Sequence, residues 1–309
     1  MKLQLNNSKQ RVRFPMMWIL SLCFVTSIHA QEIIEIYPGK IPGATVAASK
    51  ITNDTKYPGM IRQSVIPTIQ VLLPAKEKAN GTAVLIIPGG GYSVIVYEGE
   101  GVGTAKRFAE NGITAFVLKY RLPNDSFSVD KSIAPLQDAQ QAMKYIRENA
   151  GKWNVDVRKI GVVGFSAGGH LASTLATHFN KSYVDNPQNT NLRPDFQVLV
   201  YPVITMQENL THKDSRKKLL GSEPSKEKVD LFSNELQVND STPPAYLTHT
   251  ADDNVVDVDN SINYFEALRK RKIAVEMHIY PKGGHGFIFR QPSWMDTLLQ
   301  WMKNNKWLN

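Results

Sequence analysis

Residues 160–171 read Ile-Gly-Val-Val-Gly-Phe-Ser-Ala-Gly-Gly-His-Leu, an apolar run that leads directly into a serine flanked by glycines. Within this stretch, Gly164–Gly168 matches G-x-S-x-G, a pattern that places a serine on a sharp turn between a strand and a helix. The turn strains the serine backbone, and glycines leave the space that a Cβ would fill. The stretch therefore predicts a strand over Ile160–Gly164, a helix over Ala167–His178, and Ser166 as a nucleophile.

An ordinary strand-to-helix turn or a phosphate-binding loop would also be rich in glycine. A phosphate loop requires G-x-x-x-x-G followed by Lys and then Ser or Thr, whereas Gly169 is followed by His170 and Leu171. The strand and helix patterns on either side favour the serine nucleophile over both alternatives.

Strand and helix patterns alternate along the rest of the chain. Short apolar or alternating runs predict strands at Ile69–Leu73, Ala83–Ile87, Ile113–Tyr120, Ile160–Gly164, Gln197–Tyr201, Ala245–Thr250 and Ala274–Ile279. Helical spacing predicts helices at Gly103–Asn111, Leu136–Glu148, Ala167–His178, Asn260–Lys270 and Trp294–Trp307. This alternation favours an α/β fold with a mostly parallel, doubly wound sheet and helices on both faces.

The chain has 309 residues, 42% of them hydrophobic, with no internal repeat and no linker that would divide it. We expect one catalytic domain over residues 67–309. Residues 31–66 are rich in Pro, Gly and Thr and predict an irregular N-terminal arm. The segment Gln207–Asp240 should leave the sheet and could form a small cap over a site.

The first thirty residues have the composition of a secretory signal peptide. Four basic residues and no acidic one accompany an apolar run from Met16 to about Ile28, which stops at Ala30. The run is short for a bilayer span, which takes about 20 apolar residues. We therefore expect export to the periplasm or beyond, with no stable membrane insertion after cleavage. A retained anchor is one alternative, and a lipid on Cys23 is another, which the bulky Leu22 disfavours.

Loss of this leader would remove the only cysteine and lower the formal net charge from +8 to near +4. The remaining basic residues are scattered, with only Arg216–Lys218 and Arg269–Lys272 as short clusters, so no nucleic-acid partner is expected. Without cysteine, the mature chain has neither a disulfide nor a thiolate catalyst. No His, Asp and Glu residues recur at metal-ligand spacing, so we expect no metal and no other cofactor.

A second glycine cluster, Pro88–Tyr92, follows the predicted strand Ala83–Ile87. In acyl transfer, backbone N–H groups aimed at the carbonyl oxygen contribute roughly 2.7–4 kcal/mol each, and glycines let them approach the substrate. The esterase pattern at this loop is HGGG. Pro88 replaces its His, so the match is partial, and a tight glycine turn is the alternative.

A serine nucleophile needs a base and an orienting acid, which follow this type of turn in the order Ser, Asp or Glu, His. Only His285 lies in a glycine-rich loop after a late strand. His278 lies inside that strand, and His170 lies one turn along the helix after Ser166, so both are expected to be structural. His285 is the predicted base.

Asp252 and Asp253 are the candidate acids. Both follow the predicted strand Ala245–Thr250 at its carboxyl end, where open α/β sheets place their sites. The pattern D-x-x-V, read from Asp252 to Val255, favours Asp252 over Asp253.

Together these motifs resemble the bacterial acetyl-xylan esterase-like branch of the α/β hydrolases, a relative of the hormone-sensitive-lipase-like carboxylesterases. The resemblance runs from about Ile66 to the C-terminus and rests on Ile87–Tyr92, Tyr120–Leu122, Gly164–Leu171, Arg193–Asp195, Tyr201–Val203 and Gly284–Phe287. It implies an α/β-hydrolase fold and hydrolysis of short acyl esters, commonly acetyl groups on plant polysaccharides. The roles it implies are nucleophile, base and acid for Ser166, His285 and Asp252, and oxyanion donors for the N–H groups of Gly90, Gly91 and Ala167.

Three other functions stay open. A general short-chain carboxylesterase would use the same residues. Asp252–Val255 also resembles the acid loop of prolyl-oligopeptidase-like serine peptidases, in which the first Asp is the acid, although those enzymes carry a large propeller domain that this sequence does not contain. A non-catalytic carbohydrate-binding relative is disfavoured by the complete set of triad residues.

Three aromatic residues beside the motifs, Tyr92, Phe287 and Trp294, are candidate platforms for a sugar ring. Burial in the core is the alternative for each, because aromatic side chains are mostly buried. Together with export and the lack of sequence for a large hydrophobic lid, they favour an acylated carbohydrate as the substrate. The sequence predicts no particular oligomeric state.

Overall fold

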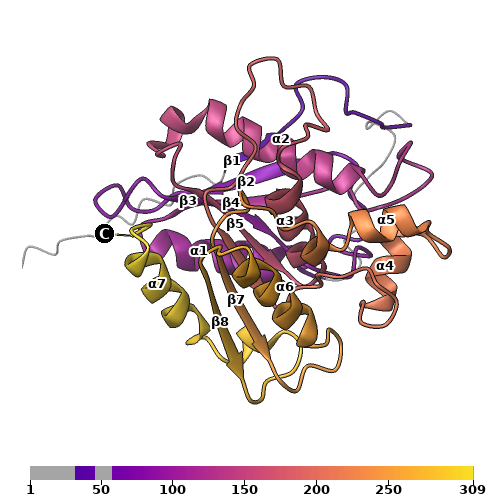
Figure 1. Ribbon diagram of the computed structural model, residues 1–309. Coiled ribbons are helices and arrows are strands. Elements are labelled where there is room, and N and C mark those ends of the chain that lie inside the picture. Colours follow the sequence, from indigo (N-terminus) through magenta and orange to yellow (C-terminus); the bar gives the residue numbers. More distant parts are fainter. Residues whose placement is uncertain (1–31, 46–57, 309) are drawn as a thin grey trace, which may run out of the picture. The chain divides into compact units, whose positions relative to one another are not determined.

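The computed structural model describes residues 32–45 and 58–308 (Figure 1). The predicted leader at residues 1–30, with Cys23, lies outside the described residues, as does part of the predicted N-terminal arm.

Within the described ranges, eight strands form one sheet in the order β1-β2-β4-β3-β5-β6-β7-β8. The strands are β1 (Glu32–Glu35), β2 (Thr68–Leu72), β3 (Ala83–Ile87), β4 (Thr114–Lys119), β5 (Ile160–Phe165), β6 (Gln197–Val200), β7 (Ala245–Thr250) and β8 (Val275–Tyr280). β2 pairs antiparallel with β1 and β4, and the other neighbours pair parallel. The predicted α/β-hydrolase fold with a mostly parallel sheet is confirmed.

Helices cover both faces of this sheet. They are α1 (Gly103–Glu110), α2 (Ala134–Glu148), α3 (Ala167–His178), α4 (Lys213–Leu220), α5 (Lys226–Leu231), α6 (Asp259–Lys270) and α7 (Trp294–Asn304). α1 and α7 pack on the face to which β3 directs Val84 and Ile86. α2, α3 and α6 pack on the face that receives Leu85 and Ile87, because neighbouring strand residues point to opposite faces. Figure 1 shows α7 close to α1, and α4 together with α5 on the other side of the view.

The sequence predictions locate these elements closely. Each of the seven predicted strands is present, with its ends shifted by at most one residue. The five predicted helices are present as well, and the largest shift is in α7, which ends at Asn304 and not at Trp307.

The prediction of an irregular N-terminal arm is wrong for the start of that arm, because β1 lies there. This strand of four residues lies at the sheet edge and pairs with β2 alone. Its sequence, Glu-Ile-Ile-Glu, does not alternate, and Ile33 is 63% exposed. Backbone hydrogen bonds to β2 hold the strand in place. Its sequence therefore shows no alternation of buried and exposed residues from which a strand could be predicted. The excursion over Gln207–Asp240 carries the two short helices α4 and α5.

Candidate active site

Ser166 lies on the turn between β5 and α3, as the sequence predicts. Its backbone has φ +52° and ψ −121°, a strained conformation for a residue other than glycine. The turn is fixed on both sides, since Ser166 N–H donates to the Val200 carbonyl at 3.1 Å and the Ser166 carbonyl accepts from Val203 N–H at 3.0 Å. Hydrogen bonds to β6 and to the residues after it thus hold Ser166 in this strained conformation.

The flanking glycines are required by close packing. A Cβ on Gly164 would lie 2.4 Å from the Gly168 carbonyl oxygen and 2.5 Å from Ala172 Cβ. A Cβ on Gly168 would lie 2.2 Å from the Ile87 carbonyl oxygen. Neither position has room for a side chain, so β5 can pack this tightly against α3, and α3 against the end of β3, only with glycine at both places.

His285 reaches Ser166 from the loop that follows β8. Its Nε2 lies 2.9 Å from Ser166 Oγ, within hydrogen-bond distance. The loop needs glycines for its shape, because Gly284 and Gly286 on either side of His285 have φ of +61° and +70°. The structure therefore brings together the predicted nucleophile and the predicted base.

The predicted acid, Asp252, is wrong in this geometry, because Asp253 is the residue that contacts the base. Asp253 Oδ2 lies 2.7 Å from His285 Nδ1, and the Asp253 side chain has no exposed surface. Asp253 is also fixed, since its Oδ1 accepts hydrogen bonds from the N–H groups of Val255 and Val256. Burial alone would raise the pKa of Asp253, but hydrogen bonds from His249 and His285 lower it below its ordinary value.

Asp252 instead supports the histidine loop. Its carboxylate accepts the N–H of Gly284 at 2.8 Å and the N–H of Gly283 at 3.1 Å. These two backbone bonds lower the pKa of Asp252, and the residue is exposed. Asp252 and Asp253 are neighbours whose side chains leave the turn in different directions, and the D-x-x-V pattern does not say which one faces the histidine.

His249 supplies a second support for Asp253. Its Nε2 lies 3.2 Å from Asp253 Oδ2 and 3.0 Å from the Val256 carbonyl oxygen. Both of these oxygens are acceptors, so Nε2 carries the proton and donates. Its Nδ1, 2.8 Å from Ser261 Oγ, then accepts. A general base of this type requires a buried, hydrogen-bonded carboxylate behind it, and His249 helps to orient that carboxylate.

The glycine loop after β3 places free N–H groups near the serine turn. Gly90 has φ +123°, and a Cβ there would lie 2.2 Å from the Val94 carbonyl oxygen. Its own carbonyl accepts from the N–H groups of Ser93 and Val94, which turns the loop back on itself. Within residues 32–45 and 58–308, the N–H groups of Gly90, Gly91 and Ala167 donate no hydrogen bond, so they remain available to an oxyanion.

The predicted sugar platforms, Tyr92, Phe287 and Trp294, are wrong, because all three side chains are buried. Each is at most 1% exposed. The Tyr92 hydroxyl donates to His170 Nδ1 at 2.8 Å, Phe287 packs on Tyr201, and Trp294 packs on Phe165. None of the three rings has a free face for a ligand.

His170 is structural, in line with the prediction. It is fully buried, and its Nε2 lies 2.8 Å from the Phe232 carbonyl oxygen, to which it donates. Burial lowers the pKa of His170 to about 4, so the ring is neutral near pH 7.

Two residues near the site, Tyr201 and Glu100, have no role predicted from the sequence. Tyr201 follows β6 with φ +38°, and its ring centroid lies 4.7 Å from that of His285. Its hydroxyl donates to Glu100 at 3.0 Å, and Glu100 is only 4% exposed. Nothing in the local sequence Tyr-Glu-Gly-Glu-Gly-Val distinguishes Glu100 from the neighbouring Glu98.

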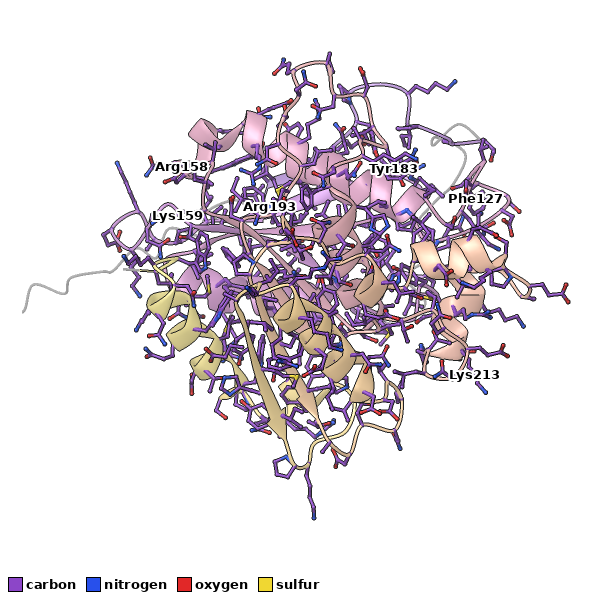
Figure 2. All side chains as sticks on the ribbon, viewed as in Figure 1. Phe127, Arg158, Lys159, Tyr183, Arg193 and Lys213 are labelled. Carbon is purple, nitrogen blue, oxygen red and sulfur yellow. The ribbon has the colours of Figure 1, made fainter. Side chains whose placement is uncertain are left out.

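His212, just before α4, also faces the site. Its Cε1 lies 3.9 Å from the position that a Cβ on Gly91 would take. Its Nδ1 lies 2.8 Å from the hydroxyl of buried Ser215. In the described part of the chain that hydroxyl has no other acceptor, so it donates to Nδ1, and the His212 proton is then on Nε2. Lys213, the next residue, is exposed and projects away at the start of α4 (Figure 2).

Two further properties concern the described residues as a whole. No group of three or more His, Cys, Asp or Glu side chains among them is arranged to hold a metal ion. Nor is any helix in these ranges long and apolar enough to cross a membrane.

Comparison with known proteins agrees with this geometry. A family model described as BD-FAE matches residues 69–268. A solved structure of an acetyl ester-xyloside bifunctional hydrolase from Caldicellulosiruptor lactoaceticus is 32% identical, with a TM-score of 0.76. The alignment covers 90% of this chain and 97% of that one.

Two curated relatives are longer proteins. An acetylxylan esterase of Xylanibacter ruminicola is 37% identical over 239 residues, which cover 74% of this chain and 46% of that protein. The endo-1,4-beta-xylanase B of Butyrivibrio fibrisolvens is 42% identical over 204 residues, which cover 65% of this chain and 32% of that protein. The chain thus spans just under half of the length of the first relative and about a third of the length of the second.

Proposed function

The chain belongs to the BD-FAE family of α/β-hydrolase-fold proteins, and from this premise we propose that it is an exported serine esterase. Its proposed substrates are short acyl esters, above all acetyl esters, on a polysaccharide such as xylan or on its oligosaccharides. The observation that carries the proposal is the hydrogen-bonded chain from Ser166 through His285 to Asp253, with distances of 2.9 and 2.7 Å.

The reaction follows from these contacts. Ser166 Oγ attacks the ester carbonyl carbon while its proton passes to His285 Nε2, and Asp253 stabilises the imidazolium that forms. His285 returns the proton to the alcohol oxygen, which leaves, and the acyl group stays on Ser166. Water, deprotonated by His285, then attacks the carbonyl carbon of this acyl-enzyme, the bond to Ser166 Oγ breaks, and His285 returns the proton to Oγ, which releases the carboxylic acid and free Ser166.

Negative charge develops on the carbonyl oxygen in both steps. The proposed donors are the N–H groups of Gly90, Gly91 and Ala167, because they have no other acceptor in the described ranges. Each such donor is worth roughly 2.7–4 kcal/mol of transition-state stabilisation. Pro88 replaces the first residue of the HGGG pattern, but the proposed donors do not include it: two come from the glycines after it, and Ala167 lies at the start of α3.

The carbohydrate part of the proposal rests on two observations. Two of the three relatives named above are an acetylxylan esterase and an acetyl ester-xyloside bifunctional hydrolase. In addition, His212 offers an imidazole N–H beside the Gly91 loop, and a polar alcohol with several hydroxyls can accept from it. A general short-chain carboxylesterase is the alternative function, and such an enzyme would not use the His212 N–H to bind its substrate.

A substrate series separates the two. The mature protein is given acetylated xylo-oligosaccharides and nitrophenyl esters from acetyl to octanoyl, and release of acid is measured. We expect acetate release from the oligosaccharides and a kcat/KM that falls with chain length. An open apolar groove would instead gain about 0.8 kcal/mol per buried CH₂. A kcat/KM that rises steadily to octanoate, with no acetate released from xylo-oligosaccharides, contradicts the carbohydrate assignment.

The His212→Ala variant sharpens the same series. It should raise KM for the acetylated xylo-oligosaccharides about 2- to 10-fold, which corresponds to one lost hydrogen bond, and leave KM for nitrophenyl acetate nearly unchanged. His278→Ala, at a histidine in β8 paired with Glu276, is the control and should change neither value. An equal effect of His212→Ala on both substrates would remove His212 from sugar recognition.

Export is proposed from the basic and apolar pattern of residues 1–30. The intact mass of the protein recovered from the cell envelope or medium tests it. We expect a chain that begins at Gln31, whereas an uncut leader or a lipid on Cys23 would contradict this part of the proposal.

A further inference from the structure

Glu100 is a buried carboxylate next to the site. It lies in the short π-helical segment η2 (Tyr97–Val102), between β3 and α1, and is 4% exposed. In the described part of the chain, no Lys or Arg forms an ion pair with it. Burial of an ionisable group is costly unless other groups satisfy it, so its partners indicate why it is there.

The two oxygens of Glu100 bind two different parts of the site. Oε2 accepts the N–H of Gly89 at 2.6 Å, at the start of the glycine loop. Oε1 accepts the hydroxyl of Tyr201 at 3.0 Å. The Tyr201 ring in turn packs against His285, with 4.7 Å between the ring centroids. One carboxylate therefore connects the loop that carries the oxyanion donors with the ring of the base.

Glu100 also lies close to the nucleophile. A Cβ placed on Gly89 would be 3.0 Å from Glu100 Oε2 and 2.9 Å from Ser166 Cβ. The carboxylate and the serine thus approach Gly89 at the same point. A shift of Glu100 would move the glycine loop relative to Ser166, and misplacement of reacting groups by as little as 1 Å can lower a rate about 100-fold.

The charge of Glu100 faces few titratable groups. These are the buried phenols of Tyr201 and Tyr120, which are neutral, and His285. Burial raises the pKa of Glu100 above its ordinary value, although the hydrogen bonds from Gly89 and Tyr201 and the nearby His285 oppose that rise. Both oxygens accept hydrogen bonds, which fits the ionised form. Among these groups, only His285 gains a positive charge during the reaction, and a buried negative charge favours that state.

We propose that Glu100 is a positioning residue for the proposed ester hydrolysis. It holds the glycine loop through Gly89 and holds His285 through Tyr201, and its charge stabilises the imidazolium of the transition state. This inference rests on the proposed esterase activity, but it concerns a residue outside the triad and the oxyanion loop.

Glu100→Gln tests the charge while it keeps the shape. A glutamine can still accept from Gly89 and can donate to the Tyr201 oxygen, so the fold should persist, as a thermal melt will check. We expect kcat for nitrophenyl acetate to fall at least about tenfold with KM changed less than about twofold. The acidic limb of the kcat/KM profile should move to lower pH, because loss of the negative charge makes His285 easier to deprotonate.

Three further variants separate positioning from general damage. Glu100→Asp keeps the charge on a shorter side chain, so it should restore the pH profile but not the full kcat. Tyr201→Phe keeps Glu100 and breaks its link to His285, so kcat should fall severalfold with KM nearly constant. Glu235→Gln, at another largely buried carboxyl that accepts from Thr205 Oγ1, is the matched control and should leave the pH profile in place.

The outcomes are distinct. If the wild type is active and Glu100→Gln has the same kcat and the same pH profile, this inference alone is overturned. It is also overturned if Glu235→Gln shifts the pH profile as much as Glu100→Gln does. If Glu100→Gln does not fold, an unchanged kcat in Tyr201→Phe overturns it instead. An inactive wild type overturns the proposed function and this inference with it.

Discussion

Ser166→Ala is expected to lower kcat for nitrophenyl acetate about 10⁴- to 10⁶-fold, the loss that removal of a triad serine produces. The hydroxyl that attacks the ester is absent in this variant, while the buried turn keeps its backbone bonds to Val200 and Val203. The thermal melting temperature should therefore stay close to that of the wild type. The measurement is kcat on freshly purified protein, with the melt as evidence that the variant is folded.

Ser173→Ala is the matched control, because Ser173 is a buried serine in α3, the helix that follows Ser166, and its hydroxyl donates to the His170 carbonyl. It should keep its activity, even if it melts at a lower temperature. Wild-type turnover in Ser166→Ala would show that another residue performs the reaction.

Asp253→Asn is expected to have the second largest effect, a fall in kcat of about 10⁴-fold, the size seen when a triad aspartate becomes asparagine in a serine protease. Asp253 Oδ2 receives the Nδ1 proton of His285 at 2.7 Å and a second hydrogen bond from His249 at 3.2 Å. An amide can orient its NH₂ group toward His285, which would force the wrong tautomer, and it has no charge to stabilise the imidazolium. Comparison of kcat at fixed pH measures this loss.

Asp252→Asn provides the contrast at the neighbouring position. Its amide oxygen can still accept one of the two N–H groups of Gly283 and Gly284, so the loop should loosen without losing the base. We expect a loss of kcat far smaller than in Asp253→Asn. The reverse order of the two variants would return the acid to Asp252.

The proposed nucleophile and base could be located from the sequence because each depends on a local pattern with a steric cause. Ser166 requires glycines on both sides of a strand-to-helix turn, and His285 requires a loop with positive φ at its neighbours. The sheet could be predicted for a related reason, since buried parallel strands are continuous apolar runs. The short edge strand β1 lacks such a run and was missed.

The acid depends on geometry that the sequence does not contain. Asp252 and Asp253 occupy adjacent positions of one turn, and only the path of that turn decides which carboxylate faces His285. The same holds for the aromatic residues beside the motifs, since Tyr92 and Trp294 are buried by elements far away in the sequence. Glu100 could not be predicted either, because its partners, Gly89 and Tyr201, come together only in the folded chain.

The central claim is that Ser166 is the nucleophile of an ester hydrolase. Its most direct test is reaction of the wild type with a serine-reactive phosphonate, followed by mass spectrometry of the intact protein and of its peptides. We expect one phosphonyl group per chain on the peptide that contains Ser166, activity lost in proportion to the labelled fraction, and no label on Ser166→Ala. A label on another residue, or full labelling of Ser166 with activity retained, would contradict the claim.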